Sequence, residues 1–178
     1  MLRAARLVLV LGLVCTLLLG AQAARAQEPP DWWNYESTRD GHAYAVKVDM
    51  GLRRVFPLSG FPYVIVTGVA YASARGDGLP ELNDLSRLDA LSEALAAAVA
   101  YKTRSIYAGS AVREGQQRNY FYVSDPNGVE DVIAGVYAKL CRGCQVSTEI
   151  RADAAWSAYR DYLFPDEPTR QRYGLRAY

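Results

Sequence analysis

The sequence has one histidine, few cysteines and no excess of charge of either sign. Its 178 residues include His42 as the single histidine, three cysteines, and 20 basic against 19 acidic side chains. One histidine supplies neither the usual metal cluster nor a partner for acid–base work, so His42 is more simply structural than catalytic. A chain without a clustered basic face is not expected to bind nucleic acid. We therefore expect no catalytic constellation, no metal and no cofactor.

Long apolar runs are also scarce, because the sequence holds a single one, over residues 7–19. Arg3 and Arg6 precede it, and small residues ending at Ala26 follow. This layout is typical of a secretory signal peptide over residues 1–26, cleaved near Ala26. The run is short for a bilayer, so we expect export to the periplasm or the medium without a stable membrane anchor.

The remaining chain has the length of one domain, which we place at residues 27–166, followed by a flexible tail at 167–178. Alternating or β-branched runs predict strands, and apolar residues at spacings of three and four predict helices. We expect a loop over 27–35, strands over 42–50, 63–71, 104–112, 117–123 and 145–150, helices over 82–99 and 126–140, and a short closing helix between Asp153 and Pro165.

Without the first of these strands the order is β-α-β-β-α-β. This order predicts an α+β fold, a ferredoxin-like split β-α-β sandwich whose antiparallel sheet carries two helices on one face. The extra N-terminal strand is expected at a sheet edge, and the short C-terminal helix closes the domain. Gly115, between Arg113 and Gln116, marks a hairpin turn.

Two cysteines, Cys141 and Cys144, remain beyond the leader in what is expected to be an oxidising compartment. They follow the predicted second helix, where the negative end of the helix dipole disfavours a reactive thiolate. A structural disulfide closing this corner is therefore the preferred interpretation. Free thiols and a thiol oxidoreductase are the alternatives.

Arg118, Tyr120 and Tyr122 alternate along one predicted strand and so share one face, while Phe121 points to the other. If Phe121 meets the helices, the three form a candidate interaction surface on the helix-free face. The alternative is that the chain around Trp33 covers them. Nearer the end, Trp156 and Tyr159 favour a plug at the open side of the sandwich over a ligand clamp.

Several segments together resemble the bacterial domain of unknown function 695 family, over about residues 33–166. They are Trp33-Asn34-Tyr35, Asp40-Gly41, Phe61-Pro62-Tyr63-Val64-Ile65-Val66, Gly78-Leu79-Pro80, Gly115, Arg118-Asn119-Tyr120-Phe121-Tyr122 and the run from Ala155 to Pro165. Ala154-Ala155 departs from the pattern, which has an acidic residue before the tryptophan, and Asp153 can take its capping role. The resemblance implies an α+β fold similar to that of the regulator protein that inhibits ribonuclease E, which works by binding a partner.

These observations predict an exported, non-enzymatic protein-interaction or adaptor domain with an unknown protein partner in the cell envelope. A small-molecule binding module using the same sheet face is the first alternative. A thiol–disulfide redox protein using Cys141 and Cys144 is the second.

Overall fold

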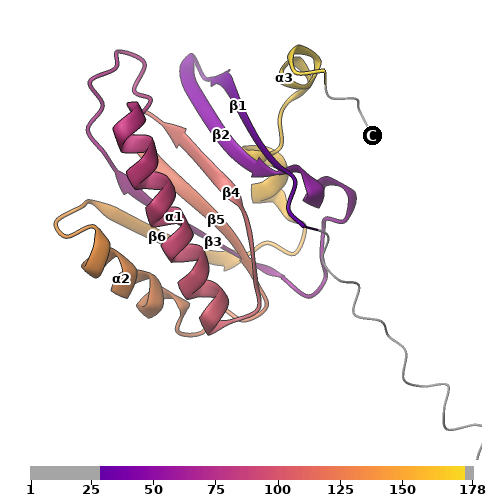
Figure 1. The fold of residues 1–178 in the computed structure, drawn as a ribbon. Coiled ribbons are helices and arrows are strands. Elements are labelled where there is room, and N and C mark those ends of the chain that lie inside the picture. Colours follow the sequence, from indigo (N-terminus) through magenta and orange to yellow (C-terminus); the bar gives the residue numbers. More distant parts are fainter. Residues whose placement is uncertain (1–28, 175–178) are drawn as a thin grey trace, which may run out of the picture.

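The computed structural model describes residues 29–174, which form a mixed α+β fold around a six-stranded antiparallel sheet (Figure 1). The strands are β1 (Trp32–Arg39), β2 (His42–Asp49), β3 (Tyr63–Ala70), β4 (Ser105–Arg113), β5 (Gln116–Val123) and β6 (Val146–Ala152). The helices are α1 (Leu82–Lys102), α2 (Val129–Leu140) and α3 (Glu167–Arg172), with a 3₁₀ turn η1 (Met50–Arg54) and a π-helical turn η2 (Tyr159–Leu163).

The strands lie in the order β1-β2-β4-β5-β3-β6, and all neighbours are antiparallel. The α+β class and the antiparallel sheet predicted from the sequence are confirmed. The predicted signal peptide, 1–26, lies outside the described residues. Within residues 29–174 we find no helix with the length and apolar character needed to cross a bilayer.

The N-terminal part of the sheet is a hairpin of two strands where the sequence indicated one. The strand predicted over 42–50 is β2, which pairs with β4 but is not the edge strand. The edge is β1, which pairs with β2 along its whole length, from Trp32 opposite Asp49 to Arg39 opposite His42. The loop predicted over 27–35 is therefore wrong from Trp32 onward. The turn of the β1–β2 hairpin is Asp40-Gly41. Both residues have positive φ (52° and 82°), which suits the twist of a tight hairpin.

The predicted hairpin between β4 and β5 is confirmed, with Glu114 and Gly115 both at positive φ in the turn. β4 carries an irregularity in register between Tyr107 and Gly109. Gly109 has φ 145°, and a Cβ there would lie 2.2 Å from the backbone oxygen of Lys47 on β2. A glycine is therefore needed where β2 meets the sheet.

Helices α1 and α2 cover one face of the sheet (Figure 1). The predicted first helix is confirmed, and Leu88, Leu91, Leu95 and Val99 are buried against the sheet. Each such side chain contributes about 1.5–3 kcal/mol on burial, which is what holds the helix on the sheet. Leu82, which the sequence pattern placed in the same stripe, is instead 82% exposed.

Helix α2 begins at Val129, three residues later than predicted. Asp125, Pro126 and Asn127 form a turn instead, in which the carboxylate of Asp125 accepts from the N–H of Asn127 (3.0 Å). Gly128 precedes the helix at φ 69°. At the other end Gly143 has φ 78°, the left-handed conformation expected of a residue that stops a helix.

The C-terminal segment differs most from the sequence prediction. The closing helix is reduced to the π-helical turn η2, and residues 167–172 form α3 where a flexible tail was predicted. The Asp166 carboxylate caps α3 by accepting from the N–H of Thr169 (3.0 Å). Thr169 is buried, and its hydroxyl lies 3.0 Å from the Ser37 hydroxyl on β1. This contact with β1 positions α3 on the domain. The sequence prediction did not include β1 and therefore had no partner for this helix.

The sheet is thus covered on both faces, and its two faces have separate hydrophobic cores. One core lies under α1 and α2 and includes Ile65 and Phe121. The other lies under η1, η2 and the segment before α3, and includes Tyr122, Trp156 and Tyr159. The second core is what shapes the candidate site.

Alanine substitutions at two glycines are expected to change the stability in opposite directions and so test the packing of β2 against β4. Gly109→Ala places a methyl group against β2 and is expected to lower the free energy of unfolding by roughly 1–3 kcal/mol. Gly135→Ala, in α2 with no atom within 4 Å of the added Cβ, is expected to raise it by about 0.5–1 kcal/mol. Urea unfolding curves of the two variants check the difference, and equal midpoints would contradict the placement of β2.

Candidate functional site

The predicted surface of Arg118, Tyr120 and Tyr122 lies on one face of β5, opposite the face of Phe121, as the alternation indicated. Its exposure was predicted wrongly. Tyr122 is fully buried and Tyr120 is 3% exposed, whereas Arg118 is exposed. The C-terminal segment, not the lead-in alone, folds back over the two tyrosines and leaves only part of this face open.

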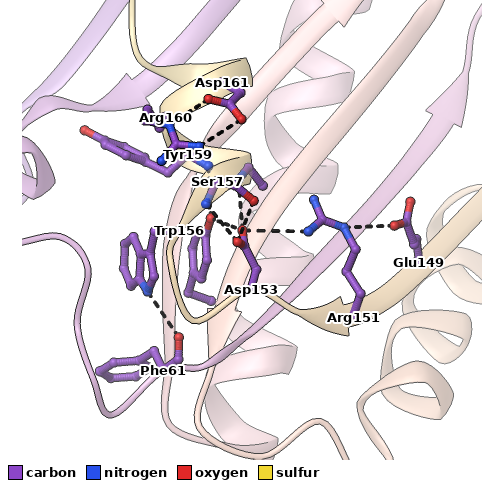
Figure 2. A network of polar contacts seen from close by, with 11 residues as sticks. Phe61, Glu149, Arg151, Asp153, Trp156, Ser157, Tyr159, Arg160 and Asp161 are labelled. Atoms are coloured by element: carbon purple, nitrogen blue, oxygen red, sulfur yellow. Dashed lines mark hydrogen bonds and ion pairs between the residues drawn. The ribbon is translucent and has the colours of Figure 1, made fainter.

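The cover is fixed by an aromatic stack. The indole of Trp156 lies parallel to the ring of Tyr122, with centroids 3.8 Å apart and planes 6° apart. Its Nε1–H donates to the backbone oxygen of Phe61 at 3.2 Å (Figure 2). Trp156 and Tyr159 are both fully buried, so the predicted plug is confirmed and the ligand clamp is wrong.

Asp153 anchors the same segment through four hydrogen bonds to its carboxylate. The donors are the N–H and hydroxyl of Ser157 (2.8 and 2.6 Å), the N–H of Ala158 (2.9 Å) and the hydroxyl of Tyr122 (2.8 Å). Tyr122 in turn accepts from the N–H of Tyr159 at 2.9 Å. Burial of Asp153 raises the pKa of its carboxyl, but these hydrogen bonds outweigh burial and the net pKa is lowered.

Beside this cover lies a hollow of about 450 Å³, which we call the Arg–Tyr hollow. Arginines and tyrosines from β1, β2, β4, β5 and η2 dominate its wall. The lining residues are Arg39, Tyr44, Ala111, Arg113, Glu114, Gln116, Arg118, Tyr120 and Tyr162. Arg118 and Tyr120 of the predicted surface therefore belong to it, and Tyr122 does not.

The aromatic wall of the hollow holds one arginine in place. The guanidinium of Arg39 lies over the ring of Tyr44 at 4.8 Å and over the ring of Tyr162 at 5.5 Å. Tyr162 also stacks on Tyr120, with centroids 6.3 Å apart and planes 19° apart. Burial raises the pKa of the Tyr44 and Tyr120 hydroxyls well above their ordinary value, so both remain protonated.

A second arginine belongs to the rim. Arg113 pairs with Asp40 in the β1–β2 turn (3.1 Å) and with Glu114 in the β4–β5 turn (2.8 Å). Glu114 also pairs with Nδ1 of His42 at 3.1 Å. His42 is half exposed and contacts the Arg113–Asp40–Glu114 cluster, which joins the two hairpin turns. Among residues 29–174 no group of three or more histidine, cysteine or acidic side chains is placed to hold a metal.

The sequence reading missed Arg39, Tyr44 and Tyr162 as site residues. The available signal was the Asp40-Gly41 pair between two alternating runs, which is typical of a tight hairpin and would have placed Arg39 beside β2. No comparable signal existed for Tyr162, because its position depends on the fold of the C-terminal segment over the sheet.

The sulfur atoms of Cys141 and Cys144 lie at disulfide distance, 1.94 Å apart. The pair directly follows the C-terminal end of α2 and packs against the core beneath α1 and α2. This placement agrees with a structural bridge at the helix–strand corner. The pair lies apart from the Arg–Tyr hollow, whose lining residues include neither cysteine.

Comparison with known families identifies one relationship. Residues 30–164 match the family described as "Family of unknown function (DUF695)". The chain belongs to this family. The resemblance seen in the sequence is thereby confirmed as to the family, while its likeness to the ribonuclease E inhibitor remains an expectation.

Two further comparisons returned nothing. No curated protein matches the chain, and no solved structure matches it. For this member of the DUF695 family, function must therefore be argued from the site itself.

The disulfide can be tested by peptide mapping. Trypsin cleaves after Arg142, between the two cysteines, so a bridge keeps two otherwise separate peptides joined. We expect the joined peptide without reduction and two peptides after it, measured by mass spectrometry of protein alkylated before digestion. Recovery of both peptides in alkylated form without reduction would contradict the bridge.

The Asp153 anchor predicts a specific response to acid. Because the folded state lowers the pKa of this carboxyl, the charged form stabilises the fold at neutral pH, and that contribution is lost as the pH falls through the lowered value. Asp153→Asn is expected to lower the free energy of unfolding by about 1–3 kcal/mol at pH 7 and to flatten its decline below about pH 4. Asp131→Asn, at an exposed position on α2, is the control. Parallel pH profiles for wild type and Asp153→Asn would exclude the anchor.

Proposed function

We propose that this chain is a non-enzymatic binding protein that holds a small molecule in the Arg–Tyr hollow. One observation carries the proposal: side chains from four strands and the C-terminal segment converge on a concave site of about 450 Å³. That volume lies within the range of about 300–1,000 Å³ typical of small-molecule sites. The lining combines aromatic surface with charged groups that can orient a ligand.

The hollow favours a small molecule over the adaptor role expected from the sequence. A flat protein contact built on Tyr120 and Tyr122 would need both rings at the surface, and both are buried under the C-terminal segment. What remains open is concave, and it is lined by Arg118 and the exposed edge of Tyr162. A concave site encloses a small ligand, whereas a protein partner needs a broader contact area.

The ionisable groups of the hollow support binding rather than catalysis. Tyr44 and Tyr120 stay protonated because burial raises their pKa, and Glu114 is held in an ion pair with Arg113 and contacts Nδ1 of His42. Arginine does not lose its proton in proteins. These groups can fix a ligand through charge and hydrogen bonds, but they are poorly suited to accept a proton from it.

Two features of the setting belong to the same proposal. The leader-like residues 1–26 support action outside the cytoplasm, in the periplasm or as a secreted protein. The strand order β4-β5-β3-β6, with α1 and α2 as the connections, supports the ferredoxin-like arrangement for the central part of the domain.

The proposal is tested by screening a metabolite library of anionic, neutral and cationic compounds for ligands that raise the melting temperature. A ligand at about a hundred times its Kd adds about 2.7 kcal/mol of stability, which such a screen detects. Gln116→Trp fills the mouth of the hollow from an exposed lining position, and Gln145→Trp makes the same change away from it.

We expect hits for wild type and Gln145→Trp that disappear for Gln116→Trp. Hits that persist unchanged in Gln116→Trp, or a turnover product formed from any hit, would remove the proposed function.

A further inference from the structure

We propose that the ligand of the Arg–Tyr hollow is an anion, with a carboxylate or phosphate group held between Arg39 and Arg118. The inference rests on the proposed function and specifies its ligand chemistry. It also divides the three arginines of the hollow into two that bind the ligand and one, Arg113, that positions the rim.

Arg113 has its charge already matched. Asp40 and Glu114 both lie within ion-pair distance of its guanidinium, at 3.1 and 2.8 Å, and its side chain is 28% exposed. These contacts tie the β1–β2 turn to the β4–β5 turn. A guanidinium shared by two carboxylates has little attraction left for a ligand anion. Arg113 therefore shapes the hollow without supplying its charge.

Arg39 keeps its hydrogen-bond donors available. The rings of Tyr44 and Tyr162 contact the guanidinium by cation–π stacking, and stacking occupies the face of the group rather than its edge. Within residues 29–174 no carboxylate forms a hydrogen bond or ion pair with Arg39, although hydrogen bonds from α3 and, more weakly, the Arg39 charge lower the pKa of the Asp166 carboxyl. The N–H groups in the guanidinium plane can thus form a bidentate contact with an anion, and the stacked rings reduce the side-chain freedom lost on binding.

Arg118 is the least committed of the three. In the described part of the chain it has no ion pair or hydrogen bond, and its charge acts on the hydroxyl groups of Tyr44 and Tyr120, which line the same hollow. Its stem lies across Gly68 of β3, where an added Cβ would come within 3.2 Å of the Arg118 Cγ. An unmatched cation at the wall of a concave site, beside buried aromatic rings, concentrates anions there.

Tyr120 adds a donor beside the two arginines. Its ring is 3% exposed, yet it lines the hollow, and its raised pKa keeps the hydroxyl proton in place. In the described residues this hydroxyl donates to no other group. Two guanidinium edges and one phenol hydroxyl form a set of donors without a matching acceptor, which is the requirement of an oxyanion.

The test uses three matched probes: benzoate, phenyl phosphate and the neutral benzamide. Each is titrated into the protein while backbone amide shifts are followed by NMR, in wild type, Arg39→Gln, Arg118→Gln and the control Arg142→Gln. Arg142 is exposed, lies beside the disulfide and gives the same change in net charge. The carboxylate and phosphate arms show which anion the site prefers.

We expect at least one anion to bind about tenfold or more tightly than benzamide, with shifts at the residues of the hollow. This preference should shrink to about threefold or less in Arg39→Gln and Arg118→Gln and persist in Arg142→Gln. Equal binding of benzamide in the hollow overturns the anion inference and leaves the proposed function standing. A preference that survives both substitutions, or no binding of either anion, also overturns it, and the library screen then judges the proposed function separately.

Discussion

The carboxylate of Asp153 is the interaction on which the second face of this protein depends. It lies directly after the edge strand β6 and receives four hydrogen bonds, three of them from the turn that follows and one from Tyr122 in the sheet. The chain reverses there and brings Trp156, at φ 54°, onto the ring of Tyr122. A non-glycine residue at positive φ is tolerated because the stack and the hydrogen bonds over-determine its position.

This closure creates the hollow as well as the core. Once Trp156 and Tyr159 are buried, the π-helical turn carries Tyr162 to the edge of the covered region, where it stacks on Tyr120 and on Arg39. Tyr162 also supplies the backbone oxygen that accepts from the Tyr44 hydroxyl, at 2.5 Å. The hollow therefore lies at the boundary between the covered and the uncovered part of the sheet. One end of its wall is formed by Tyr162, which lies 118 positions after Tyr44 in the sequence.

The parts of the fold that sequence predicted well are those with local causes. The 3.6-residue periodicity of α1, the alternation of β5 and the Gly115 turn are each fixed within a dozen residues, and the structure keeps them. The burial of Tyr120 and Tyr122 could not be predicted in this way, because alternation assigns a residue to a face and says nothing of what covers that face. The same reason explains α3, which was predicted as part of a flexible tail: its position depends on the contact of Thr169 with Ser37 on β1, which no local pattern reveals.

A polar row on the opposite face explains why Arg118 stays on the side of the hollow. Lys47, Ser110, Asn119, Thr67 and Thr148 lie opposite one another across five strands beneath the helices. Thr67 bonds Tyr137 of α2 and Thr148 at 2.9 Å, and Asn119 accepts from Tyr107 at 2.9 Å. Lys47 pairs with Asp89 of α1 at 3.3 Å.

A slip of one residue in β3 would move Thr67 to the other face and break its hydrogen bond with Tyr137. A slip of one residue in β5 would likewise move Asn119 and leave the Tyr107 hydroxyl without its acceptor. It would also carry Arg118, the neighbour of Asn119, under the helices, where an unpaired charge is costly. Apolar side chains can repack after a slip in register, whereas a buried hydrogen bond requires one particular donor opposite one particular acceptor. The polar row therefore favours one register of β5, and that register places Arg118 and Tyr120 on the wall of the hollow.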